Sequence, residues 1–202
     1  ASSSEMFGTT PPPQSENSSF NPVSPYGCAK LYAYHMTKAY RTAYGLFAAN
    51  GILFNHESER RGVNFVTRKI TQGAARIKLG LQDKLVLGNL DAKRDWGHAR
   101  DYMEAIHMIM QHDKPEDWVV ATGEYHTVRE FLLAVFDYFK LDWEKHVVID
   151  NIYNRPNEVP ALLGDATKIK NALGWKPKVS FKELVKLMCD SDYEKEKSTL
   201  VP

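Results

Sequence analysis

Apolar residues recur at helical spacing in several segments of the chain, and turn-forming residues separate these segments. Ser24 and Pro25 are typical of a helix start, apolar and aromatic residues recur as far as Tyr44, and Gly45 is a typical helix end. These signals predict a helix over residues 25–44. The stretch before it is rich in Pro, Ser and Asn, which predicts a loop.

Strands and helices are predicted to alternate through the rest of the chain. The expected strands are residues 46–54, 84–90 and 118–122, and the expected helices cover 64–79, 98–112, 127–139, 165–174 and a segment from Ser180 through Met188. Thr127 with Glu130, and Ser180 with Glu183, form capping boxes. Residues 191–202 form a charged tail without an apolar face, so we expect them to fray. The alternation predicts an α/β fold.

Composition and charge exclude several classes of protein. The chain has 202 residues, is 43% hydrophobic, and carries 26 basic against 25 acidic residues, so no overall field favours nucleic acid or an anionic membrane. Two cysteines are too few for a disulfide framework, and no apolar stretch reaches the roughly 20 residues of a spanning helix. We expect a cytoplasmic globular protein with neither nucleic-acid nor membrane partners.

The N-terminus and the histidines add two further expectations. No basic and apolar stretch of a secretory signal follows Ala1, and we do not expect Ala1 to be a natural start. The seven histidines show no spacing typical of metal ligands, so we expect no metal site.

Tyr26 and Lys30 are the first candidates for chemistry, because residues four apart share one face of a helix. An ammonium beside a phenol stabilises the phenolate, which can act as a base toward a sugar hydroxyl. The same spacing occurs at Tyr34 and at Tyr193, so it arises readily by chance. Only Tyr26 follows a block of two hydroxyls and a carboxylate, Ser3–Glu5.

Longer segments are more specific, and together they resemble the GDP-mannose 4,6-dehydratase family within the extended short-chain dehydrogenases. They cover nearly the whole chain and are ASSSE, SPYGCAKLYAY, NGILFNHES, RRG-x-NFVTRKI, LGNLDAKRDWGHARDY, ATGEYHTVREF, YNRPNEV, LLGD-x-TK and LGWKP. The chain departs from the family at Ser3, where Thr is usual, at Glu59, where Pro is usual, and in a short segment between Leu141 and Asn154.

The resemblance implies dehydration of GDP-mannose to GDP-4-keto-6-deoxymannose, with NADP as the cofactor that takes up and returns a hydride. Tyr26 would take the proton of the sugar 4-hydroxyl, and Lys30 would hold Tyr26 and the nicotinamide ribose. Ser3 would bond the 4-oxygen. Glu5 would remove the C5 proton and supply the acid for loss of water.

The resemblance also implies residues that bind ligands. His56 and Arg61 are expected cofactor contacts. Residues expected to bind the GDP-sugar are Asn55, Val66, Lys69, Gly88, Arg94, Arg155 and Glu158. Arginines suit the diphosphate because a guanidinium presents paired donors to phosphate oxygens. A homodimer or homotetramer is expected as well.

The implied fold is the C-terminal part of a Rossmann-like parallel sheet with a smaller α/β substrate-binding domain. Residues 1–56 and 95–123 would belong to the sheet domain, and residues 57–94 and 124–190 to the sugar-nucleotide-binding domain. The Gly-rich turn that holds a dinucleotide pyrophosphate is absent from the sequence, so we expect the 202-residue chain alone to be inactive. Two alternatives stay open: a GDP-sugar epimerase or reductase, and a non-catalytic module that binds GDP-sugars.

Overall fold

The computed structural model describes residues 1–150, 152 and 157–200, which pack into two compact units. Unit 1 contains residues 1–56, 93–125 and 157–178, and unit 2 contains residues 57–92, 126–156 and 179–202. Residues 157–178 therefore pack with the sheet domain, whereas the sequence placed them in the sugar-nucleotide-binding domain. Each unit is described by itself below.

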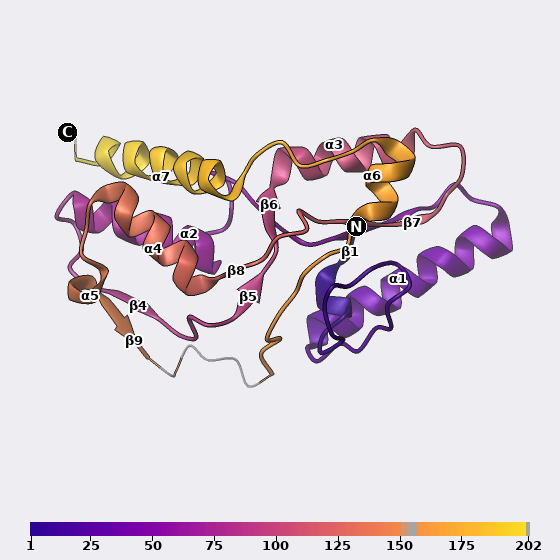
Figure 1. Ribbon diagram of the computed structural model, residues 1–202, viewed down its shortest axis with the longest axis horizontal. Coiled ribbons are helices and arrows are strands. Elements are labelled where there is room, and N and C mark those ends of the chain that lie inside the picture. Colours follow the sequence, from indigo (N-terminus) through magenta and orange to yellow (C-terminus); the bar gives the residue numbers. More distant parts are fainter. Residues whose placement is uncertain (151, 153–156, 201–202) are drawn as a thin grey trace. The chain divides into compact units, whose positions relative to one another are not determined.

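Unit 1 is built on a three-stranded parallel sheet in the order β1-β2-β7 (Figure 1). Ser2 of β1 pairs with Ile52 of β2, and Ile52 pairs with Val119 of β7. The elements of this unit are β1 (Ser2–Ser3), η1 (Ser4–Met6), α1 (Pro25–Tyr44), β2 (Asn50–Leu53), β3 (Asn55–Glu57, whose last residue falls in unit 2), β5 (Lys93–Arg94), β6 (Trp96–His98), α3 (Ala99–Met110), β7 (Asp117–Val120) and α6 (Thr167–Leu173).

Helices cover both faces of this sheet, with α1 on one side and α3 on the other (Figure 1). Side chains alternate along β2: the amide of Asn50 reaches the Tyr34 carbonyl of α1, whereas a Cβ added at Gly51 would lie 2.6 Å from Ile106 of α3. The core between these layers includes Phe7, Phe54 and several fully buried strand residues. The sheet expected from the sequence is thus present as a buried parallel sheet.

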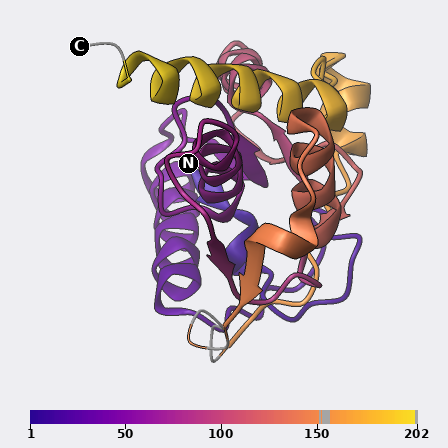
Figure 2. The same ribbon diagram turned by 90° about the vertical axis from the view of Figure 1, so that its left-hand side faces the viewer.

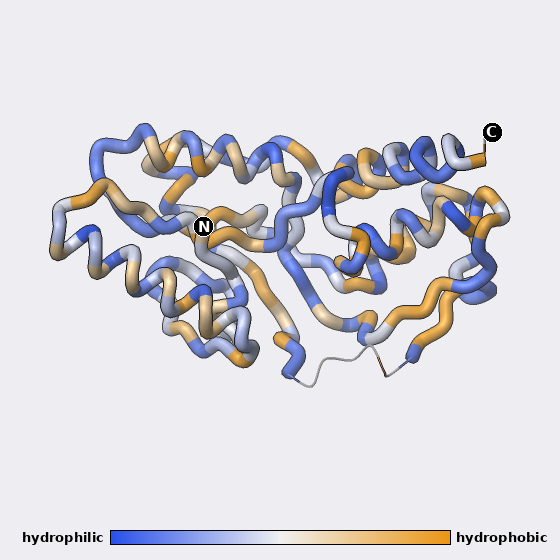
Figure 3. The backbone as a smooth tube through the Cα atoms, turned by 180° about the vertical axis from the view of Figure 1, so that it is seen from behind, coloured by the Kyte–Doolittle hydropathy of each residue, from blue (hydrophilic) through white to orange (hydrophobic). Residues whose placement is uncertain are grey.

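Unit 2 packs three helices together beside a two-stranded parallel sheet of β4 and β9 (Figure 2). Its elements are α2 (Val66–Lys78), β4 (Leu85–Leu87), β8 (His126–Thr127), α4 (Val128–Phe139), α5 (Trp143–His146), β9 (Val147–Ile149) and α7 (Phe181–Ser198). Both capping boxes predicted from the sequence, at Thr127 and at Ser180, are confirmed. Figure 3 shows that β4 and β9 are hydrophobic, whereas the end of α7 is largely hydrophilic.

Local signals placed α1 correctly, but two other predictions were wrong. Ser24 caps α1 and Gly45 ends it in the left-handed conformation, as predicted. The strand expected over 46–54 is limited to Asn50–Leu53, because the Ala48 N–H bonds back to Leu46 and the Ala48 carbonyl accepts from Arg41. This local turn leaves residues 46–49 outside the sheet.

The charged tail expected over 191–202 is also wrong, because α7 continues to Ser198. Asp192 and Glu196 are buried on the face of α7 that packs on α2. Their carboxylates pair with Arg68 and Arg76 of α2. These ion pairs therefore join α7 to α2.

Candidate active site

The first turn of α1 lies against the segment Ser3–Glu5, and this contact brings the four predicted catalytic residues together in unit 1. A Cβ added at Gly27 would lie only 2.7 Å from the Glu5 carbonyl oxygen, so the absence of a side chain at Gly27 permits this close approach. Ser24 fixes the start of the helix, because its hydroxyl accepts the Gly27 N–H at 3.0 Å.

Ser3 and Glu5 are held by a short helical turn that follows β1. The Ser3 hydroxyl caps this turn by accepting the Glu5 N–H at 3.2 Å, and Ser3 is buried. Glu5 is half-buried. A hydroxyl and a carboxylate thus lie beside the start of α1.

Tyr26 and Lys30 form the second half of the cluster. Tyr26 is 55% exposed, so its phenol is open to a ligand. The Lys30 ammonium lies 5.7 Å from the Tyr26 ring centroid and donates to the Ala1 carbonyl oxygen at 3.0 Å. The first residue of the chain therefore holds Lys30 next to Tyr26.

Tyr34, which shares the spacing of Tyr26, has a different environment. Its ring is 4% exposed and its hydroxyl donates to Asp117 at 3.0 Å. Burial and the neighbouring Asp117 carboxylate raise the pKa of Tyr34. Tyr34 therefore stays protonated and is not suited to act as a base. Its spacing from Lys38 matches that of Tyr26 from Lys30, but its surroundings do not support the same chemistry.

Other predicted residues lie near the ends of the strands in unit 1. The Oδ1 atom of Asn55 is buried without a hydrogen-bond partner among the described residues. The His56 ring stacks on Tyr102 with centroids 5.2 Å apart, and its Nδ1 lies 2.9 Å from the Phe54 carbonyl oxygen. An unpartnered buried amide oxygen is costly, so Asn55 is suited to accept a hydrogen bond from a ligand.

Arg94 and Glu158, both predicted substrate contacts, pair with each other. Arg94 Nη2 donates to Glu158 Oε1 at 2.7 Å, and Nη1 donates to the Val159 carbonyl oxygen at 2.7 Å. Arg94 is 8% exposed, whereas the Glu158 side chain is 23% exposed. The third predicted residue of this group, Arg155, lies outside the described residues.

The remaining predicted residues, Arg61, Val66, Lys69 and Gly88, belong to unit 2. Arg61 is fixed on two sides: its Nε lies 3.0 Å from Glu57 Oε2, and its guanidinium carbon lies 3.5 Å from the Phe65 ring centroid. Burial raises the pKa of Glu57.

Val66 begins α2, and Lys69 follows on the same helix. Burial lowers the pKa of Lys69. The residue preceding the helix, Phe65, has no side-chain oxygen to cap it, so no side-chain cap occupies the first N–H groups of α2 in the described residues. Gly88 follows β4 and is half-buried.

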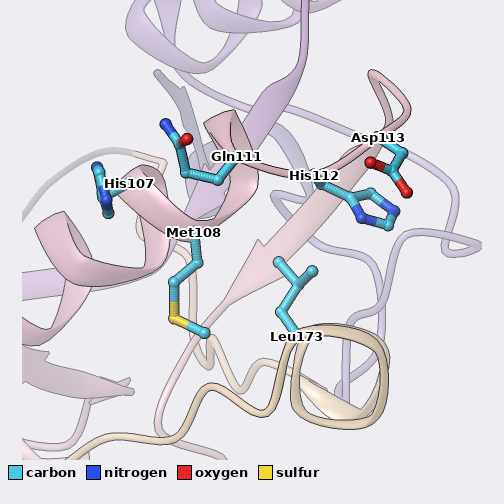
Figure 4. Close-up of a pocket in the computed structure, with 6 residues that line it drawn as sticks. All are labelled: His107, Met108, Gln111, His112, Asp113 and Leu173. Carbon is cyan, nitrogen blue, oxygen red and sulfur yellow. The ribbon is translucent and has the colours of Figure 1, made fainter.

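A surface pocket of about 390 Å³ in unit 1 lies at the end of α3 (Figure 4). Its lining residues are His107, Met108, Gln111, His112, Asp113 and Leu173. None of them is a residue that the sequence predicted for catalysis or binding. The pocket is therefore not the predicted site.

Sequence reasoning missed a polar cluster that lies beside the predicted catalytic residues. It consists of Ser2, Arg41, Asn50 and Asp117, and it also contains the Tyr34 hydroxyl. No spacing motif joins these residues, because the bonded pairs are 48 to 83 positions apart along the chain. Asn50 inside a buried apolar run was the one signal of such a cluster.

Comparison with solved structures defines the class of fold. RMD from Pseudomonas aeruginosa, complexed with NADPH, superposes with a TM-score of 0.88 at 24% identity, over 96% of this chain and 65% of that chain. A dTDP-glucose 4,6-dehydratase from Bacillus anthracis, in complex with NAD, gives a TM-score of 0.85 at 21% identity, over 98% of this chain and 61% of that chain. The chain thus has the α/β fold of these nucleotide-binding proteins.

Sequence comparison identifies the family. The family model described as GDP-mannose 4,6 dehydratase matches residues 1–188. GDP-mannose 4,6 dehydratase 1 of Arabidopsis thaliana is 61% identical over 96% of this chain and 54% of its own length. The human GDP-mannose 4,6 dehydratase is 52% identical over 96% of this chain and 57% of its own length. The chain belongs to the GDP-mannose 4,6-dehydratase family, and it spans about half the length of these relatives.

Proposed function

We propose that the protein dehydrates GDP-mannose to GDP-4-keto-6-deoxymannose. One observation carries the proposal: the first turn of α1, which carries Tyr26 and Lys30, packs on the segment Ser3–Glu5, so a phenol, an ammonium, a hydroxyl and a carboxylate come from adjoining segments. These are the groups that this reaction needs, and the chain belongs to the corresponding family. The proposal extends to the whole protein, because the chain spans only about half the length of its relatives.

Each group has a distinct part in the proposed reaction. Tyr26 accepts the proton of the sugar 4-hydroxyl while Ser3 bonds the same oxygen, and a 4-ketone results. The ketone acidifies the C5 hydrogen, which Glu5 removes, and the same carboxyl then protonates the departing C6 hydroxyl. A bound nicotinamide cofactor would supply the hydride chemistry, taking hydride from C4 and returning it to C6. A proton added at C5 completes the balance, and the net change is loss of one water.

NADP is the cofactor that we propose, and the residues present fit its nicotinamide end. Tyr26 is exposed and lies beside Lys30, which suits contact with a nicotinamide ribose. His56 and Arg61 are proposed contacts on the basis of the family pattern. The structural neighbours were solved with NADPH or NAD, which supports a nicotinamide cofactor, and the choice of NADP follows from the family resemblance.

Several polar groups of unit 1 are proposed substrate contacts. Asn55 offers its unpartnered Oδ1, and Arg94 with Glu158 offers a paired cation and anion. Val66, Lys69, Gly88 and Arg155 complete the proposed set.

A homodimer or homotetramer and a cytoplasmic location are also proposed; the free thiols of Cys28 and Cys189 support a reducing compartment. No helix in the described part of the chain has the length and apolar character needed to cross a membrane.

Incubation with GDP-mannose and NADP in heavy water tests the proposal, using the longest polypeptide that the gene encodes. We expect a product lighter by one water, with one deuterium at C5. A related epimerase or reductase would not release water, and a non-catalytic module would bind GDP without turnover. Either result would rule out the proposed dehydration.

Replacing the proposed C5 base sharpens this test. Glu5→Gln should lower the dehydration rate at least about a hundredfold, because general acid–base catalysis typically contributes that much. Glu104→Gln is the matched control, since Glu104 pairs with Lys178 on the surface and has no proposed role. Full dehydratase activity of Glu5→Gln would assign the base to another residue.

A further inference from the structure

A chain of buried polar side chains crosses the sheet of unit 1. The Ser2 hydroxyl donates to Asn50 Oδ1 at 3.1 Å, and Asn50 Nδ2 donates to Asp117 Oδ1 at 2.9 Å. Ser2 is 6% exposed and Asn50 is 3% exposed. A buried polar group that loses its hydrogen-bond partner destabilises the folded protein, so these bonds hold β1, β2 and β7 in a fixed arrangement.

Asp117 joins this chain to α1. Arg41 donates to both carboxylate oxygens of Asp117, at 3.0 and 3.2 Å, and Tyr34 donates at 3.0 Å. Lys38 faces the same carboxylate at 3.8 Å. Burial opposes ionisation of Asp117, but the hydrogen bonds from Arg41, Asn50 and Tyr34 outweigh it and lower its pKa. The carboxylate is therefore a charged anchor for α1.

Both ends of this chain lie next to proposed catalytic residues. Ser2 stands between Ala1, whose carbonyl accepts the Lys30 ammonium, and Ser3. On α1, Tyr34 follows Lys30 by four residues, about one helical turn, so the two share one face. A shift of β1 against α1 would separate Lys30 from its acceptor.

We propose that Asn50, together with Asp117, is a positioning residue that fixes β1 against α1 and so holds Lys30 beside Tyr26. Asn50 touches none of the reacting groups and acts through Ser2 and through Asp117. This inference rests on the proposed function only for its kinetic consequence, because the placement of Lys30 is measurable without turnover.

Ser2→Ala removes the bond to Asn50 with the smallest change in volume. We expect kcat for dehydration to fall about tenfold, since a displacement of about an ångström at a catalytic group costs up to about a hundredfold. The KM for GDP-mannose should stay unchanged, because Arg94 and Glu158 lie outside this chain of bonds. Thr37→Ala is the matched control on α1, where the Thr37 hydroxyl donates to the Ala33 carbonyl oxygen of the same helix.

Amine labelling with peptide mapping provides the readout that does not depend on activity. Lys30 should label faster in Ser2→Ala and in Asn50→Ala than in the wild type, whereas labelling of Lys38 should rise only in variants that loosen Asp117. The double variant Ser2→Ala/Asn50→Ala should add nothing for Lys30 beyond Asn50→Ala alone, because both remove the same bond.

The outcomes separate this inference from the proposed function. A wild-type protein without dehydratase activity would contradict the proposed function, while faster Lys30 labelling in Ser2→Ala would still support the positioning. Unchanged Lys30 labelling in Ser2→Ala would overturn the positioning, whatever the activity. The positioning would also be overturned if kcat fell only in proportion to the loss of folded protein, while Lys30 in the remaining folded fraction was labelled as in the wild type.

Discussion

Asp117 of unit 1 and Asp192 of unit 2 have similar partners but opposite shifts of pKa. Each accepts from an arginine and from a hydroxyl: Asp117 from Arg41 and Tyr34, Asp192 from Arg68 and Thr71. The pKa of Asp117 is lowered by its donors in spite of burial. The pKa of Asp192 is raised, because burial outweighs its donors.

The difference comes from solvent exposure and from the number of donors. The Asp117 side chain is 12% exposed and receives a bidentate guanidinium, an amide and a phenol. The Asp192 side chain is 1% exposed, and the same guanidinium that it binds also donates to the carbonyls of Glu59 and Arg61. The direction in which an ion pair shifts the pKa of its carboxylate therefore depends on how completely that carboxylate is desolvated.

Asp192→Ala should have the largest effect on stability. It leaves the buried Arg68 guanidinium without its counter-ion, which typically costs about 3–5 kcal/mol of the free energy of unfolding. Urea denaturation measures this loss. Asp190→Ala, on the same helix, removes an exposed pair with Lys186 and an exposed hydrogen bond from the Tyr138 hydroxyl, and should cost no more than about 2 kcal/mol. Equal losses in the two variants would contradict a buried role for Asp192.

Asp117→Asn should cost about 2 kcal/mol at neutral pH, since hydrogen bonds to a charged group are worth about that much. The folded pKa of Asp117 is lowered from 3.8, so its stabilisation is fully present above that value and lost as the pH falls through the folded pKa. The difference between wild type and Asp117→Asn should therefore shrink in acid. Unfolding measured over an acid pH series gives this difference.

Asp192→Asn should show the opposite dependence on pH. The folded pKa of Asp192 is raised above 3.8, so its titration favours folding below that value and this contribution is lost as the pH rises through the folded pKa. The difference between wild type and Asp192→Asn should therefore grow in acid. Parallel curves for the two asparagine variants would refute the comparison.

Tyr34→Phe removes one donor to Asp117 and should cost about 1 kcal/mol. Thermal unfolding measures the loss. Tyr40→Phe, an exposed tyrosine on the same helix, is the control and should be close to neutral. An equally small effect at Tyr34 would show that its hydroxyl is replaced by solvent.

Lys38→Ala should have the smallest effect. The Lys38 ammonium is 3.8 Å from Asp117 and its side chain is 46% exposed, so its loss should cost less than about 0.5 kcal/mol. Urea denaturation again measures this loss of stability. A loss as large as that of Tyr34→Phe would show that Lys38 contributes to the anchoring of α1 by Asp117 as much as Tyr34 does.

Local signals in the sequence were sufficient for the elements that depend on neighbours along the chain. Ser24, Pro25 and Gly45 define α1, and the capping boxes at Thr127 and Ser180 define the starts of two more helices. The spacing of Tyr26 and Lys30 recurs at Tyr34 and Tyr193, so the catalytic residues were proposed from the longer segments that resemble the family.

Features that depend on distant partners were not predictable in this way. Leu46 and Phe47 have the apolar character of a strand, yet both are more than 40% exposed because Arg41 and a local turn take their segment out of the sheet. Asp192 and Glu196 look like solvated charges, but their partners stand 124 and 120 positions away. The pairing of Arg94 with Glu158 spans 64 positions and follows from no local pattern.

The ionic face of α7 bears on how the protein should be handled. Glu196 accepts from Gln72 at 2.7 Å as well as from Arg76, so two residues of α2 depend on a residue that looks expendable. Trimming residues 191–202 to aid crystallisation would remove both carboxylates and expose part of unit 2. An affinity tag should therefore leave residues 191–198 in place.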